Sequence, residues 1–390
     1  MKYLIEKSGL TATVTNIQWE RIFLKLYVRL DYRDNKKKYD KLEYYAVDAF
    51  GKAGVKFQVI PTDMKNQYIL RVNVTNNGTN QCIPKGIYRV CVCEGENVLA
   101  ECVTDMGIVS SLPDMSRGFL YSELASSYNV NFYIEDGSVE LPFRMCVANA
   151  RNAMLTFPHN LSFPYRIKTA FVESFGNPRV IFRKLYKLHA VLAGKRREKT
   201  VLFLTEQSDT VKSNLKAVSD RMIERGLDKE YRILYSARIY TDRKPRMKKL
   251  AEWLKLMKSL GRSGIIFMDD HAPVLDWLKL RDDTTVIQLW HAGAGFKSSG
   301  YSRWGHMYCP PPQSCHRQYR YGISGSKRIA PFFSEVWGIN DELVLPTGMP
   351  RMDEYLDEEN RRRKTEELYE KYPMCKGKKV ILFAPTYRGN

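Results

Sequence analysis

In the first 150 residues apolar and polar side chains alternate with a period of two, which predicts β-strands. Within residues 21–30 the apolar side chains at every second position share one face: Ile22, Leu24, Leu26, Val28 and Leu30. Residues 67–74 and 87–93 alternate in the same way, and Asn77-Gly78 between them is a turn signal. The pattern predicts an antiparallel β-sandwich over residues 1–160.

Residues 161–198 change to a basic segment with helical spacing. One stripe is apolar and consists of Ile181, Leu185, Leu188 and Leu192. Arg183, Lys184 and Lys187 fall off this stripe, so the segment reads as a basic amphipathic helical connector. Such a helix can lie on an anionic membrane surface or pack on the next domain with a solvated basic face.

From residue 199 onward short apolar strands alternate with helical patterns. We expect strands at residues 201–204, 231–235, 264–268 and 285–290. A helix is expected over 213–225, and the next has one apolar stripe formed by Met247, Leu250, Leu254 and Met257. This rhythm predicts a parallel, Rossmann-like sheet over residues 199–376. The overall fold class is therefore α/β with an N-terminal all-β domain.

The composition of this 390-residue chain limits the classes of partner that we expect. A net charge of +19 favours an anionic partner such as a membrane, a phosphate-rich substrate or nucleic acid. Nucleic acid is disfavoured because the aromatic residues lie in strands and are not interleaved with the basic runs. The apolar stretch at the N-terminus is too short for a secretory signal, and no apolar run is long enough to span a bilayer. Eight scattered cysteines fit a reducing compartment, so we expect a cytoplasmic protein.

His291 is the first candidate for chemistry, because it follows a strand and precedes a loop rich in glycine and serine. In parallel sheets ligands bind beyond the carboxyl ends of the strands, which directs attention to the loops at Thr205, Asp269 and His291. The loop and nearby Lys297 could cradle a phosphate, although the glycine spacing fits no general phosphate motif. The spacing alone leaves a catalytic and a structural histidine both open.

Paired carboxylates at Asp269 and Asp270 could bind a metal, orient a histidine or hydrogen-bond a polyol. Further along the chain, Cys309, Cys315 and His316 do not have a usual zinc-ligand spacing, and a fourth ligand is missing. We therefore expect no metal site.

Arg351 lies in a turn fixed by glycine and two prolines after an apolar strand. Its forked guanidinium suits phosphate. An equally open alternative is that Arg351 ties down its own loop through Asp353.

Three ordered segments give these residues a common context: WHAGA at 290–294, GMPRMD at 348–353 and APTYR at 384–388. Together with residues 205–209 and 214–217 they resemble the CDP-glycerol glycerophosphotransferase family of teichoic acid synthesis. The resemblance covers residue 199 to the end of the sequence. It departs from the family pattern at Ala292 and Ala294, where the family has Gly and Pro.

The resemblance implies a two-lobed GT-B fold and transfer of glycerol phosphate from CDP-glycerol, without a cofactor, to a polyol-phosphate or lipid-linked glycan acceptor. The enzyme would release CMP at the cytoplasmic face of the membrane. His291 would be the general base. The implied donor contacts are Trp290, His291, Ala292, Gly293, Ala294, Arg351, Pro385 and Thr386.

The apolar segment within residues 377–390 is expected to be the first strand of an absent second lobe, so this chain alone is expected to be inactive. Two other functions stay open. The chain could be a non-catalytic module that binds a membrane or an anionic polymer, or a GT-B glycosyltransferase that uses a sugar nucleotide.

Overall fold

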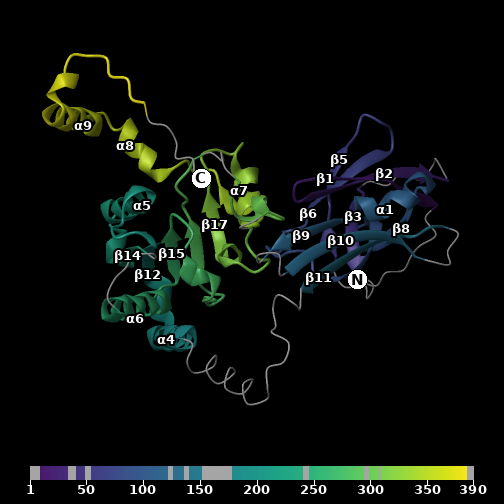
Figure 1. The fold of residues 1–390 in the computed structure, drawn as a ribbon, viewed down its shortest axis with the longest axis horizontal. Coiled ribbons are helices and arrows are strands. Elements are labelled where there is room, and N and C mark those ends of the chain that lie inside the picture. The colour runs from purple at the N-terminus through teal and green to yellow at the C-terminus, as the bar shows by residue number, and fades with distance from the viewer. Residues whose placement is uncertain are drawn as a thin grey trace.

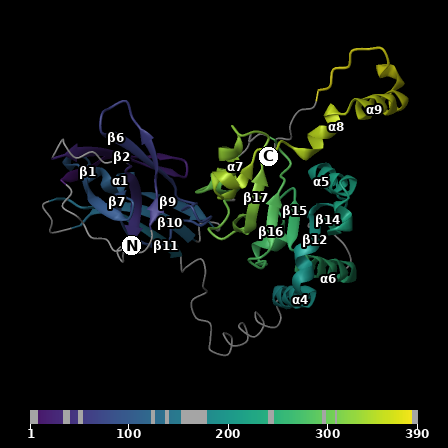
Figure 2. The same ribbon diagram turned by 180° about the vertical axis from the view of Figure 1, so that it is seen from behind.

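The computed structural model describes residues 9–33, 41–48, 54–121, 126–135, 140–151, 178–239, 246–293, 298–306 and 309–383. The described residues up to 151 form a β region, and those from 178 onward form an α/β region. The two regions can be followed in Figures 1 and 2.

The β region is one 11-stranded sheet with the order β5-β6-β2-β1-β8-β7-β11-β10-β9, in which β3 joins β7 and β4 joins β3. Its elements are β1 (Leu10–Glu20), β2 (Phe23–Tyr32), β3 (Glu43–Asp48), β4 (Val55–Lys56), β5 (Gln58–Pro61), β6 (Gln67–Asn73), β7 (Gly86–Glu94), β8 (Asn97–Thr104), α1 (Leu112–Met115), β9 (Arg117–Tyr121), β10 (Ser126–Ile134) and β11 (Phe143–Arg151). The described strand pairs of this region are antiparallel, as expected, except that β1 pairs in parallel with β8.

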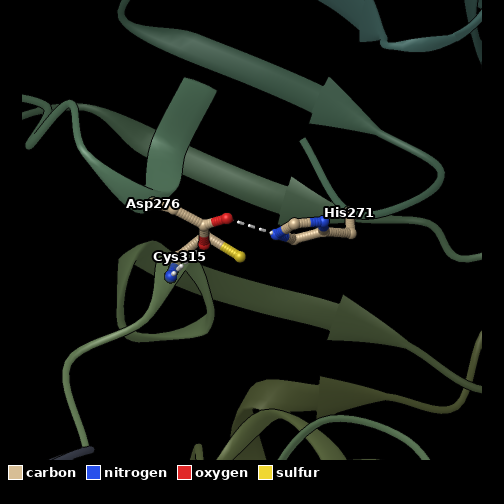
Figure 3. A group of neighbouring side chains, drawn as sticks. All are labelled: His271, Asp276 and Cys315. Carbon is tan, nitrogen blue, oxygen red and sulfur yellow. Dashed lines mark hydrogen bonds and ion pairs between the residues drawn. The ribbon is translucent and has the colours of Figure 1, made fainter. Parts of the chain in front are cut away.

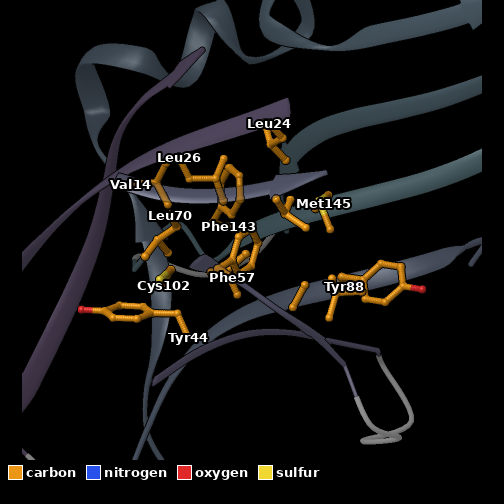
Figure 4. Packing of buried hydrophobic residues seen from close by; sticks show 14 of the residues in the cluster. Val14, Leu24, Leu26, Tyr44, Phe57, Leu70, Tyr88, Cys102, Phe143 and Met145 are labelled. Atoms are coloured by element: carbon orange, nitrogen blue, oxygen red, sulfur yellow. The ribbon is translucent and has the colours of Figure 1, made fainter. Parts of the chain in front are cut away.

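Strand β2 shows why the alternating pattern folds as it does. Its inward side chains, those of Leu24, Leu26, Val28 and Leu30, are 0–1% exposed, since side chains of a strand point alternately to opposite faces. Leu24 of β2 and Leu70 of β6 pack in the same core as Phe143 and Met145 of β11, although β11 is a neighbour of neither β2 nor β6 in the sheet (Figure 4). The sheet therefore encloses one main core, and a smaller cluster is buried apart from it and consists of Val47, Cys91, Cys93 and Val98.

The α/β region contains a seven-stranded sheet with the order β13-β14-β12-β15-β16-β17-β18. Its elements are α4 (Pro178–Ala193), β12 (Thr200–Thr205), β13 (Gln207–Ser208), α5 (Ser213–Glu224), β14 (Arg232–Ile239), α6 (Arg246–Arg262), β15 (Ile265–Met268), β16 (Thr285–Gln288), β17 (Tyr319–Ile323), α7 (Ala330–Trp337), β18 (Val344–Leu345), α8 (Asp353–Leu356) and α9 (Glu358–Lys371). All pairs are parallel except β13 with β14, so the predicted parallel sheet is confirmed.

The apolar stripes predicted for α4 and α6 were largely wrong. Helix α4 buries Phe182, Tyr186 and Ala190, whereas Leu188 and Leu192 of the predicted stripe are exposed. The packing of α4 on α6 explains which face of α4 is buried. Phe182 stacks on Trp253, and Gly261 lets α6 approach the α4 backbone. In α6, Met257 is buried as expected, but the other three stripe residues are exposed. Each helix has apolar residues on more than one face, so the apolar pattern alone does not identify the buried face.

The strand expected within residues 377–390 does not form among the residues described, which end at 383. Val380, Ile381, Leu382 and Phe383 are irregular and 56–88% exposed. A strand needs a hydrogen-bonded neighbour, and no described strand lies beside this segment.

The two regions share a packed boundary. Tyr301 and Trp304, from the α/β region, belong to the hydrophobic core of the β region. Arg317 donates hydrogen bonds to the Thr75 carbonyl (2.6 Å) and the Asn80 carbonyl (3.0 Å). Glu335 is buried, which raises its pKa, and its pairing with Arg21 at 2.7 Å only partly offsets this.

Candidate active site

Three loops meet at the carboxyl edge of the α/β sheet. Strands β12, β15 and β16 are neighbours in the sheet, and each leads directly into one of the loops expected to carry chemistry, at Thr205, Asp269 and His291. The parallel arrangement therefore brings the predicted residues to one edge.

His291 is held through one ring nitrogen. Its Nδ1 lies 3.3 Å from the backbone carbonyl of Asp269 and 3.5 Å from the carboxylate of Asp270. Both partners can only accept a hydrogen bond, so we assign the proton of the neutral ring to Nδ1. This leaves Nε2 as a proton acceptor on a side chain that is 51% exposed. Of the roles considered for the acidic pair, the contacts favour orienting a histidine.

Asp269 combines burial with an unmet hydrogen bond. Burial raises the pKa of its carboxyl group, while a hydrogen bond from Thr205 lowers it less. Its Oδ1 has no hydrogen-bond partner among the described residues. A buried oxygen in this state favours a protonated carboxyl group or a ligand that donates to it.

Trp290 forms the floor beneath His291. The two rings stack with centroids 4.4 Å apart, and Trp290 packs edge-on against the buried Trp337. Its backbone has φ of 53°, which is uncommon for a bulky residue and must be stabilised by its surroundings. The buried side chain of Gln288 accepts from Trp290 N (2.8 Å) and donates to the Asp270 carbonyl (3.2 Å), and so fixes two loops at once.

Asn214 joins the loop of His291 to that of Arg351. Its fully buried side chain donates to the Trp290 carbonyl (2.7 Å) and accepts from Arg351 N (3.1 Å). The Arg351 guanidinium donates to Ser213 Oγ at 3.2 Å. Within the described ranges no ion pair joins Arg351 to Asp353, so α5, rather than Asp353, fixes this arginine.

Gly293 packs tightly against the loop of Arg351. A Cβ atom at Gly293 would lie 3.1 Å from the Met349 side chain, and one at Gly325 would lie 2.6 Å from the Gly293 carbonyl. Ala292 continues this loop. Four further predicted residues, Ala294, Lys297, Pro385 and Thr386, lie outside the described residues.

Of the three residues considered and rejected as zinc ligands, Cys309 and His316 have other roles in the structure. The Cys309 thiol contacts the Leu120 carbonyl at 3.2 Å. Burial lowers the pKa of His316 to about 3, and its ring packs between Tyr301 and Tyr319. His316 is therefore a neutral core histidine.

Sequence reasoning missed the residues that connect these loops. In the sequence Asn214 lies only within a segment that resembles the family, and Gln288 only within the strand expected at residues 285–290. A polar residue at the end of an apolar strand was the available signal for Gln288. Nothing local to the sequence identifies their partners, which lie up to 137 positions away.

Comparisons with known proteins identify the family of the chain. The family model described as CDP-Glycerol:Poly(glycerophosphate) glycerophosphotransferase matches residues 185–390, which is more than half of the chain. The teichoic acid ribitol-phosphate polymerase TarK of Staphylococcus aureus is 34% identical over 271 residues, covering 69% of this chain and 49% of that protein. The teichoic acid poly(ribitol-phosphate) polymerase of Bacillus spizizenii is 37% identical over 191 residues, covering 49% of this chain and 30% of that protein.

A teichoic acid glycerol-phosphate primase of Bacillus subtilis is 29% identical over 140 residues, covering 35% of each chain. Among solved structures, the wall teichoic acid polymerase TagF aligns with a TM-score of 0.42 and 18% identity, over 57% of this chain and 56% of that chain. The chain spans about half the length, or less, of the first relatives it matches. By the match over residues 185–390, the chain belongs to the CDP-glycerol:poly(glycerophosphate) glycerophosphotransferase family.

Proposed function

We propose that this chain supplies the His291 side of a polyol-phosphate transferase that acts on a CDP-polyol donor. The acceptor would be a teichoic-acid-like or capsular polymer. The observation that carries the proposal is the His291 ring, whose Nε2 faces no described acceptor or donor while Nδ1 is held by Asp269 and Asp270. A GT-B arrangement, with a second lobe completing the donor cleft, would extend the α/β region described here.

In the proposed reaction an acceptor hydroxyl attacks the β-phosphorus of the donor. The new P–O bond forms as the bond to the CMP oxygen breaks, and Nε2 of His291 takes the hydroxyl proton. Arg351 would offset charge on the pyrophosphate, since α5 already fixes its guanidinium. Asp269 and Asp270 would stabilise the imidazolium that forms, as acceptors on its far nitrogen.

Two polyols are candidates. Glycerol is the polyol in the name of the family model, whereas the relatives with the highest identities are ribitol-phosphate polymerases. The glycerol-phosphate primases match at 25–29% identity. Because the ribitol-phosphate polymerases match at higher identity than the glycerol-phosphate primases, ribitol is a candidate polyol beside glycerol.

We expect CMP release from a CDP-polyol and no UDP release from a UDP-sugar when the complete gene product is supplied with a lipid-linked acceptor. The donors to compare are CDP-glycerol, CDP-ribitol and UDP-glucose. A ratio of kcat/KM that favours CDP-ribitol by tenfold, about 1.4 kcal/mol, would assign the polyol. Turnover of UDP-glucose at a comparable rate would contradict the proposal and support a sugar transferase.

We further propose that α4 places the protein on the cytoplasmic face of an anionic membrane. None of the helices that the structure describes is both long and apolar enough to cross a bilayer. The outer stripe of α4 is apolar and exposed at Leu188 (51%) and Leu192 (70%). Beside Leu192 a cavity of about 140 Å³ is lined by Arg196, Arg232 and Arg262. Apolar side chains next to arginines that form no ion pair with a described residue suit the boundary between acyl chains and anionic headgroups.

Replacing Leu188 and Leu192 together by serine is expected to weaken binding to anionic vesicles by at least about tenfold, since burial of each leucine is worth roughly 1.5–3 kcal/mol. Vesicle flotation measures the effect. The matched control is Leu356→Ser, because Leu356 is also exposed but lies on α8. Equal flotation of the double variant and the wild type would remove α4 from the membrane contact.

A further inference from the structure

Three side chains of metal-ligand type converge beside the active site. They are His271 in the loop after β15, Asp276 at the end of the 3-10 helix η5 (Pro273–Asp276), and Cys315 at the start of the 3-10 helix η7 (Cys315–Gln318). Their ligand atoms all lie within 4.8 Å of one another, and His271 Nε2 is 2.9 Å from Asp276 Oδ2. Figure 3 shows the sulfur and the carboxylate on the same side of the imidazole ring.

The surrounding hydrogen bonds hold these ligands in place. Asp276 Oδ1 accepts from Cys315 N at 3.4 Å, which turns the other oxygen toward His271. Gln318 binds η7 to η5 by donating to the carbonyls of Leu275 (2.8 Å) and Leu278 (3.0 Å). Partners of this kind orient the direct ligands in metal sites.

The arrangement does not suit a cysteine nucleophile. In a catalytic triad the histidine lies between its two partners and uses a different ring nitrogen for each. Here the carboxylate and the thiol share one side of the ring, so His271 cannot relay a proton from one to the other. A common position between all three groups remains, and it suits a cation.

The ligand types select the ion. A thiolate disfavours Mg²⁺ and Ca²⁺, whereas one sulfur, one nitrogen and one oxygen suit Zn²⁺. Tetrahedral bonds of about 2.0–2.3 Å place ligand atoms roughly 3.5 Å apart, so only small side-chain shifts are needed. The charges of Zn²⁺, a thiolate and a carboxylate cancel. Cys315 is buried, but His271 and Asp276 are 39% and 44% exposed, which leaves room for water as the fourth ligand.

We propose that His271, Asp276 and Cys315 bind one Zn²⁺ ion. The ion would fasten η7 to the loop after β15. Asp270, the neighbour of His271, lies in that loop and contacts His291, so the ion would stabilise the support of His291 without touching it. The site is separate from the donor cleft, and the proposal does not depend on the transferase assignment.

Anaerobic titration of the metal-free chain with Co²⁺ as a probe for Zn²⁺ tests the site. We expect one ion per chain and a thiolate-to-cobalt charge-transfer band that Zn²⁺ abolishes. Cys315→Ser should remove the band. Asp276→Asn should weaken Zn²⁺ binding by more than about tenfold in a chelator competition, since even outer partners of a metal site are worth 10–100-fold.

Cys309→Ser is the matched control, because this thiol lies a few positions from Cys315 but contacts the β region. It should bind Co²⁺ as the wild type does. X-ray absorption of the zinc-loaded wild type requires no variant to fold and should show one sulfur among nitrogen and oxygen ligands. A wild-type spectrum without sulfur, or an unchanged cobalt band in Cys315→Ser, would overturn the proposal.

Discussion

Replacing His291 by alanine is expected to slow CMP release by about 10²–10⁴-fold, the usual contribution of a general base. His291 Nδ1 is bound to the Asp269 carbonyl and the Asp270 carboxylate, so Nε2 is the ring nitrogen that can take the proton of the acceptor hydroxyl. Initial rates in the complete gene product, with a CDP-polyol and a lipid-linked acceptor, measure the loss.

His291→Asn separates the loss of the base from the loss of the hydrogen bond that holds the loop. Its amide can donate to the Asp269 carbonyl as Nδ1 does but cannot accept a proton, so the donor Kd should stay within about threefold while turnover falls as in His291→Ala. His306→Ala is the control, since His306 is an exposed histidine outside these contacts. Turnover of His291→Asn at half the wild-type rate or more would show that His291 is not the base.

Glu206→Ala is expected to lower the free energy of unfolding by about 3–5 kcal/mol, because it leaves a buried arginine without its partner. Glu206 is fully buried and pairs with Arg238, whose Nε lies 2.6 Å from Oε1. Its second oxygen accepts from Val274 N at 2.9 Å and anchors η5. Urea denaturation at neutral pH measures the change.

The control for this effect is Glu230→Ala, which removes an exposed carboxylate paired with Lys199 at 3.6 Å. Exposed pairs contribute about 0–1 kcal/mol. Replacing Glu206 by leucine and Arg238 by methionine together should recover much of the stability, since no buried charge is then left unpaired. A loss below 1 kcal/mol in Glu206→Ala would mean that water reaches Arg238.

The sequence predicts the sheets well because their burial pattern is local. The alternation in residues 21–30 marks β2 and its buried face, and the strand-helix rhythm after residue 199 marks the parallel sheet. It does not predict which face of α4 is buried. Phe182 and Tyr186 form one apolar stripe and Leu188 and Leu192 another, and the contacts that α6 makes through Trp253 and Gly261 decide between them.

The site was predictable in part for the same reason. The strand ends identified His291, Asp269 and Asp270, because the edge of a parallel sheet follows from strand order. The hydrogen bonds of Asn214 were not predictable, since they join residues 76 and 137 positions apart. The predicted division into domains stays a prediction.

The boundary between the two regions also changes how the chain can be divided. Trp304 lies among Phe119, Tyr121 and Tyr128 of the β region, although it follows the His291 loop in sequence. Removing the β region would leave these aromatic surfaces in water and take away two carbonyl partners of the Arg317 guanidinium, those of Thr75 and Asn80. The core of the β region is thus completed by Tyr301 and Trp304 of the α/β region, so a cut between the two regions would expose apolar surface on both sides.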